Sequence, residues 1–179
     1  MDDETRSRVF WNCYVLDKSL AEETGRSFLL PYRRCTTPLP SHTEVDELET
    51  WPPLPMSSAP LPKSVRHVVP RRGYVISCFV WTCRLAMVVE EILSLQAQGP
   101  PVSTDPWDQQ FAARQKTAKD QWQAAEELSQ QLKLWRQSIP RHLDVNPTSR
   151  ISPLPHHVVG LAVSANEPAQ AGVRRLISF

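Results

Sequence analysis

The sequence predicts an all-α fold: a partial helical domain of three main helices with a long proline-rich loop. Two observations lead to this prediction. The chain of 179 residues contains 17 prolines and only 5 glycines, which suits helices joined by proline-rich loops better than a sheet with many tight turns. Apolar residues also recur at helical spacing over about residues 3–24, 74–98 and 105–139, which we take as the three helices.

The first predicted helix covers residues 3–24. Its apolar residues recur at steps of three and four, with two aromatic residues beside them: Val9, Cys13, Leu16 and Leu20, then Phe10 and Tyr14. We expect this stripe to face the core, because a surface helix buries its apolar side. Acidic residues in the first turn suit the positive end of the helix dipole, and Gly25 is placed to end the helix in the left-handed conformation.

A long connection follows over residues 26–72. Its nine prolines exclude a long helix or a central strand: Pro31, Pro38, Pro40, Pro52, Pro53, Pro55, Pro60, Pro62 and Pro70. We therefore expect an irregular loop that is partly disordered around residues 52–63. A loop of this length in a compact domain indicates either a functional segment or disorder.

The second predicted helix, residues 74–98, is apolar on nearly all sides. A membrane span needs about 20 apolar residues, and here Arg84 and the pair Glu90 and Glu91 interrupt the run sooner. A helix of this kind is typical of the centre of a helical bundle.

The third predicted helix, residues 105–139, follows the capping residue Thr104 and ends before Pro140. One side of it is apolar: Phe111, Ala118, Trp122, Ala125, Leu128, Leu132, Trp135 and Ile139. We expect this side to be buried and the opposite, polar side to be wet. Beyond it, "PHHVVGLAVS" begins like a fourth helix that does not continue, and residues 162–179 read as an irregular tail.

Composition and motifs exclude several classes of function. The net charge of +1 does not favour nucleic-acid binding by this chain, and its basic pairs read as solvated surface: Arg33 and Arg34, Arg71 and Arg72, Arg174 and Arg175. Four scattered cysteines predict a reducing, intracellular compartment without disulfides. We find no catalytic or phosphate-binding motif, and so expect no catalytic, cofactor or metal site.

Three local patterns suggest chemistry at first, but each favours a structural interpretation. Cys78 and Cys83 are five residues apart, which puts them on different faces of a helix, and the neighbouring His156 and His157 also diverge. A buried or half-buried ion pair between Asp17 and Arg84 is a structural hypothesis that would fix the register of two helices. The residues that we expect to carry the packing are Phe10, Cys13, Leu16, Asp17, Phe79, Cys83, Arg84, Trp122, Leu132 and Trp135.

The stretch "RVFWNCYVLDKSLAEETGR" resembles a signature of the fungal-specific transcription factor domain, the helical regulatory region of fungal zinc-cluster transcription factors. Members carry a basic residue, an aromatic run, Leu-Asp-Arg/Lys and a closing Gly-Arg-Pro. In this sequence Ser27 stands in place of that proline. Three further blocks are similar to members and come in the same order: "VDELETWPPLP", "ISCFVWTCRLAMVVEEIL", and "LSQQLKLWRQSIPRHLDV" followed by "LPHHVVGL".

The resemblance implies that residues 1–161 are a partial regulatory domain of such a factor. Its implied role is control of transcription in the nucleus, through intramolecular or coregulator contacts, without catalysis and without a membrane. DNA and zinc would be bound by an upstream six-cysteine cluster that this chain lacks. We accordingly expect the chain to be a piece of a longer protein that exposes apolar surface when isolated.

Two alternatives remain open at this stage. The chain could be an unrelated helical adaptor that binds a partner helix through exposed apolar faces. It could also be an enzyme or a metal protein whose site no motif reveals.

Overall fold

A computed structural model describes residues 2–43, 45–51, 70–97, 107–144 and 161. Three helices dominate it, and the predicted all-α fold is confirmed: α1 (Asp3–Thr24), α2 (Val75–Ala97) and α3 (Trp107–Ser138). Between α1 and α2 lie two short 3-10 turns and two short strands: η1 (Tyr32–Arg34), η2 (Val45–Leu48), β1 (Thr50–Trp51) and β2 (Arg71–Arg72). The predicted fourth-helix onset and the tail lie outside the described residues, except for Leu161.

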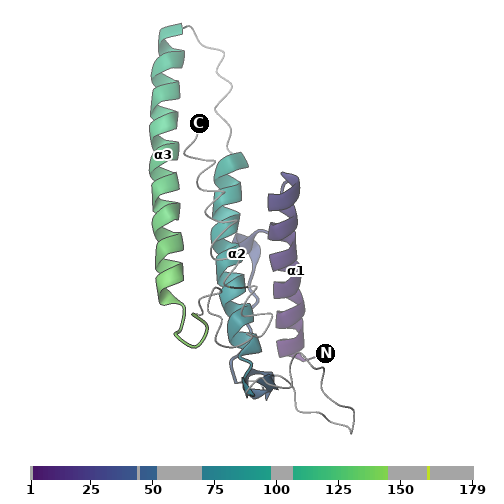
Figure 1. Cartoon of the computed structure of the whole chain (residues 1–179). Coiled ribbons are helices and arrows are strands. Elements are labelled where there is room, and N and C mark those ends of the chain that lie inside the picture. Colours follow the sequence, from purple (N-terminus) through teal and green to yellow (C-terminus); the bar gives the residue numbers. More distant parts are fainter. Residues whose placement is uncertain (1, 44, 52–69, 98–106, 145–160, 162–179) are drawn as a thin grey trace.

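The three helices stand side by side in one row, with α2 in the middle (Figure 1). One side of α2 packs against α1 through Cys83 and Ala86, in a cluster with Trp11 and Tyr14. The other side packs against α3 in a larger apolar cluster: Cys78, Trp81, Leu85, Val89, Ile92, Leu128, Leu132, Trp135, Ile139, Leu143 and Leu161. Burial on two sides explains why α2 is apolar almost all round.

The helix ends follow local chemistry. The side chain of Asp2 accepts a hydrogen bond from the backbone N–H of Thr5, which caps the start of α1. Gly25 ends α1 at a φ of 66°, so the predicted left-handed cap is confirmed. Tyr74 precedes α2 at a φ of 54°, a conformation that is rare for a bulky residue, and its ring lies 4.3 Å from that of His142.

The proline-rich connection is more regular than the sequence suggests. β1 and β2 form an antiparallel ladder that pairs Thr50 with Arg72 and Trp51 with Arg71. This ladder joins the two ends of residues 52–69, which contain the stretch predicted to be disordered and lie outside the described residues. The described part of the loop between α1 and β1 lies against α1 and the start of α2, where it supplies many of the polar contacts given below.

The predicted buried face of α1 is wrong. Leu16 is 67% exposed and Cys13 is exposed as well, whereas the buried residues of α1 are Ser7, Trp11, Tyr14, Lys18 and Ala21. Phe10 is half-buried at the edge of the α1–α2 cluster. The aliphatic stripe therefore points to solvent, because the aromatic and polar side chains opposite it find better partners in the loop and in α2.

On α3 the expected stripe is buried at its C-terminal end, where Leu132 and Trp135 pack against α2. Trp122 is 58% exposed, contrary to expectation. The helical repeat sets it about 100° from the middle of the buried stripe, so it flanks the contact instead of entering it. The side chains of Phe111 and Ala118 lie outside the described residues.

Candidate functional site

Four residues of α1 and α2 form a buried polar group that we call the Lys18 cluster: Tyr14, Asp17, Lys18 and Glu90. The Nζ of Lys18 lies 2.8 Å from Oδ2 of Asp17, 3.3 Å from Oε2 of Glu90 and 2.5 Å from the carbonyl oxygen of Leu30. Its side chain is only 1% exposed. Two carboxylates and a carbonyl thus compensate the buried ammonium group, as a buried charge requires.

Aromatic rings complete the environment of the Lys18 ammonium group. Nζ lies 4.3 Å from the ring centroids of both Tyr14 and Phe28, so the cation contacts two π-faces. Such contacts gain strength where water is excluded. The ammonium group of Lys18 therefore contacts residues of α1, of α2 and of the loop after α1.

Glu90 links α2 to both α1 and the loop. Its carboxylate accepts hydrogen bonds from the hydroxyl of Tyr14 at 2.9 Å and from the backbone N–H of Tyr32 at 2.9 and 3.0 Å. Burial, together with the hydrogen bond to Glu90, raises the pKa of Tyr14 well above its ordinary value. Tyr14 therefore stays a neutral donor, and the cluster joins three segments of the chain.

Asp17 fixes the turn after α1. Its carboxylate accepts hydrogen bonds from the backbone N–H groups of Leu29 and Leu30 at 2.9 Å each, in addition to the ion pair with Lys18. Burial acts to raise the pKa of Asp17, but the hydrogen bonds from Lys18, Leu29 and Leu30 outweigh it, so the pKa is lowered.

The expected ion pair between Asp17 and Arg84 does not form. Arg84 is exposed, and its guanidinium lies 4.6 Å from the ring centroid of Trp81. Asp17 instead pairs with the next residue in the chain and with the loop. The sequence showed a charge on α1 and a charge on α2, but it gave no sign that the loop would supply the partners.

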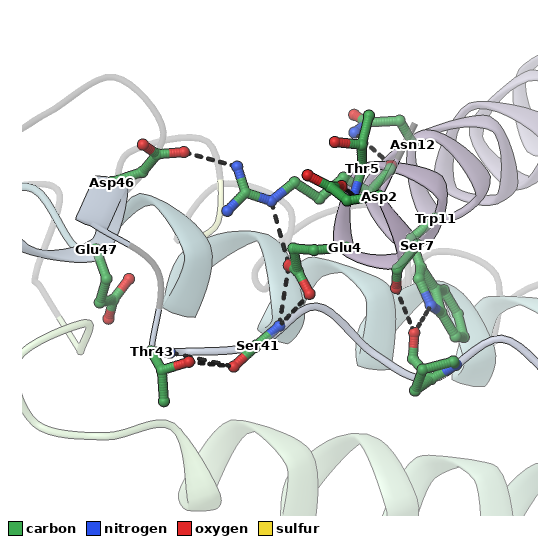
Figure 2. Close-up of polar contacts among 12 residues, drawn as sticks. Asp2, Glu4, Thr5, Ser7, Trp11, Asn12, Ser41, Thr43, Asp46 and Glu47 are labelled. Carbon is green, nitrogen blue, oxygen red and sulfur yellow. Dashed lines mark hydrogen bonds and ion pairs between the residues drawn. The ribbon is translucent and has the colours of Figure 1, made fainter.

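A second group of contacts holds the loop against the first half of α1. The hydroxyl of Ser7 and the indole N–H of Trp11 both donate to the backbone carbonyl of Pro38, as the converging side chains in Figure 2 show. The Trp11 hydrogen bond measures 2.8 Å. Two buried donors on α1 thus bind one carbonyl of the proline-rich loop.

Arg8 and Glu4 extend these contacts. Arg8 donates to Asp46 at 2.6 Å and to Glu4 at 3.2 Å, and Glu4 accepts from the backbone N–H of Ser41 at 3.1 Å (Figure 2). The carboxyl of Asp46 also helps to raise the pKa of Arg8. The acidic stretch that starts at Asp46 is therefore tied to the start of α1.

The buried carboxylate of Glu47 lies at the N-terminus of α2. It accepts hydrogen bonds from the backbone N–H of Ser77 at 2.9 Å and from the Ser77 hydroxyl. An anion in this position satisfies the open N–H groups of the first helical turn and suits the helix dipole. Sequence reasoning missed this cap, because Glu47 lies 30 residues before Ser77 in the chain.

Ser77 also lies 3.3 Å from Nδ1 of His42, so serine, histidine and glutamate meet here. The arrangement differs from that of a catalytic triad. In a triad the histidine lies between the serine and the acid, and the acid orients the histidine. Here Glu47 bonds Ser77 directly, so the serine is a donor in a helix cap.

Two of the four cysteines lie in the core. Cys78 and Cys83 are buried, and that burial raises the pKa of each thiol to about 12. Within the described part of the chain, no three histidine, cysteine or acidic side chains gather in a way that could hold a metal ion. His156 and His157 lie outside the described residues. None of the helices described is both long and apolar enough to cross a membrane.

The apolar stripe that faces away from the core is the second notable surface. We call it the outer face of α1, and it consists of Val9, Cys13, Leu16 and Leu20. All four are exposed. The inner side of α1 thus buries polar as well as aromatic side chains, whereas its outer side leaves an apolar stripe exposed.

Comparison with known protein families identifies part of the chain. Residues 1–52 match the sequence model of the Fungal specific transcription factor domain. No curated protein and no solved structure matches the chain. The matched stretch contains α1, the Asp17 turn, the carbonyl of Pro38 and the Glu47 cap, that is, most of the polar contacts described above. The match supports a partial fungal specific transcription factor domain over residues 1–52.

Proposed function

We propose that the chain is part of the regulatory domain of a fungal zinc-cluster transcription factor and controls transcription by helix packing. The observation that carries the proposal is the match over residues 1–52. In complete members of the family that the sequence resembles, zinc and DNA are bound by a separate six-cysteine cluster. The net charge of +1 agrees with a domain that does not itself bind the DNA backbone.

The contacts of the Lys18 cluster support a regulatory role without catalysis. The cluster ties α1, the loop after it and α2 into one unit. Its charged groups form ion pairs with one another. Such a joint holds two helices in one arrangement, which is what a domain that transmits a signal through packing needs. The matched family is one of transcription factor domains, so we propose a nuclear location and no enzymatic activity.

A reporter assay in yeast tests this function. The whole chain is placed between an unrelated zinc-cluster DNA-binding segment and an activation segment, and reporter output is compared with the same fusion without the chain. We expect the chain to change the output. Lys18→Met should remove the change because it breaks the cluster, whereas Lys133→Met, at an exposed position on α3, should keep it. An intact, nuclear fusion with unchanged output would contradict the proposal.

A helical adaptor outside transcription is the second candidate, and the outer face of α1 favours it, because exposed aliphatic stripes bind partner helices. The genomic sequence upstream of Met1 separates the two. Six closely spaced cysteines among lysines and arginines there support the transcription factor, and their absence supports the adaptor.

A further inference from the structure

The outer face of α1 has the spacing of a helix-pairing stripe. Val9, Cys13, Leu16 and Leu20 follow one another at steps of four, three and four residues, the pattern that places side chains between two packed helices. By the helical repeat they lie within about 60° of one another, opposite the buried Trp11. Val9, Leu16 and Leu20 are 50%, 67% and 60% exposed.

A charged residue stands at each end of this stripe. Three residues before Val9 is Arg6, and three residues after Leu20 is Glu23. Both are exposed, and the guanidinium of Arg6 lies 3.6 Å from the carboxylate of the exposed Asp3. The stripe thus begins with a positive charge and ends with a negative one.

The order of these six residues makes the stripe complementary to itself when reversed. A second copy of α1 laid antiparallel places Arg6 opposite Glu23, Val9 opposite Leu20, and Cys13 opposite Leu16. The two-fold axis then passes between Tyr14 and Val15. Each apolar residue meets an apolar residue, and each charge meets the opposite charge. A parallel pair would instead bring Arg6 to Arg6 and Glu23 to Glu23.

We propose that the outer face of α1 is the dimer interface of this chain, packed antiparallel against the same face of a second copy. The interface is isologous, as two-fold dimers are. Antiparallel packing also sets the positive end of each helix dipole beside the negative end of the other. α1 lies at the edge of the row of helices (Figure 1), and all four residues of this face are exposed. The proposal does not depend on a role in transcription.

The affinity follows from the size of the stripe. Four apolar side chains and two ion pairs make a small interface, for which we expect a dissociation constant on the order of 10 µM. Sedimentation of the purified full chain from about 1 to about 200 µM spans the expected transition. A short bismaleimide should link Cys13 of one copy to Cys13 of the other, because the two lie only about 4.5 Å apart along the axis.

Charge reversal tests the orientation. Arg6→Glu or Glu23→Arg alone puts like charges together at both ends of the interface, and should weaken the dimer roughly tenfold. The double variant should restore the original affinity. Each reversal puts a charge where the dipole of α1 favours it, so a weaker helix cannot explain the loss in the single variants.

Two further variants serve as a matched pair. Leu16→Lys puts a charge in the centre of the stripe and should leave a monomer at every concentration. Leu134→Lys, at a position that is 65% exposed on α3, should leave the dimer unchanged. Circular dichroism checks that both variants keep the helical content of the original chain.

Three results would overturn the proposal. The first is a monomer at the highest concentration, which would mean that something other than a second copy covers the stripe. The second is a dimer that Leu16→Lys does not affect. The third is a double charge reversal that fails to restore the affinity lost in the single variants.

Discussion

At the scale of residues, Lys18 shows how a buried charge can specify a fold. Its amine reaches Asp17, Glu90 and a carbonyl of the loop, and its side chain is almost wholly enclosed. Transfer of such charges out of water is costly, and good geometry only offsets that cost. The cluster matters for stability mainly because the loss of one partner leaves the other charges buried and uncompensated, which is costly in free energy.

Lys18→Met should therefore be strongly destabilising. Methionine fills similar space but leaves two carboxylates without their cation, so we expect the free energy of unfolding to fall by about 3 to 5 kcal/mol. Urea denaturation followed by circular dichroism measures this. Lys133→Met, on the exposed side of α3, should change the value by less than about 0.5 kcal/mol. Equal effects in the two variants would mean that the cluster contributes no more to the free energy of unfolding than an exposed surface position does.

Asp17 makes the stability depend on pH in the acid range. Because its pKa is lowered in the folded state, its contribution is fully present above the unfolded value of about 3.9 and is lost as the pH falls through the lower, folded value. Asp17→Asn should cost about 2 kcal/mol at pH 7. It should also flatten the stability profile below about pH 4 relative to the original chain. Denaturation at a series of pH values checks both, and parallel profiles would contradict the assignment.

At the scale of elements, α1 shows where counting apolar residues fails. Its inner side buries Trp11, Tyr14 and Lys18, whose polar atoms all find partners in the loop or on α2. Pattern reasoning placed Tyr14 beside the aliphatic stripe but left out Trp11 and Lys18, and so chose the wrong side. The helix itself, its length and its glycine end were predictable because they depend on local sequence alone.

The start of α2 depends on a residue far away in sequence. Glu47→Ala removes the anion that binds the first turn, and should lower the free energy of unfolding by about 1 to 2 kcal/mol. Hydrogen exchange at the N-terminus of α2 should quicken more than at its C-terminus. Glu49→Ala is the control, because that exposed residue bonds Gly73 only through its backbone carbonyl. If both variants behave alike, the carboxylate of Glu47 does not cap the helix.

At the scale of the whole molecule, the sequence predicted three helices in the right places and a central α2. It could not predict the Lys18 cluster, because many of its contacts come from backbone groups of Leu29, Leu30 and Tyr32, and backbone groups leave no trace in a residue pattern. The β1–β2 ladder could not be predicted either, because strands of two residues are too short to show a periodic pattern.

The arrangement of the helices also predicts thiol reactivity across the molecule. Cys13 on the outer face of α1 should react first with a disulfide reagent at pH 8 in dilute protein. Cys78 and Cys83, with pKa values of about 12, should react roughly a thousandfold more slowly until the protein unfolds. Peptide mapping by mass spectrometry after timed labelling identifies each site. Fast labelling of Cys83 in the native state would contradict its place between α1 and α2.

The two joints that α2 makes differ in kind, and this has a thermal consequence. Its joint with α3 is lined by apolar side chains such as Trp81 and Trp135, and their attraction fades in the cold. Its joint with α1 contains buried ions, whose dehydration penalty shrinks as the protein warms. Although the joint with α1 also contains an apolar cluster, we expect chilling to weaken the packing of α3 on α2 more than that of α1 on α2.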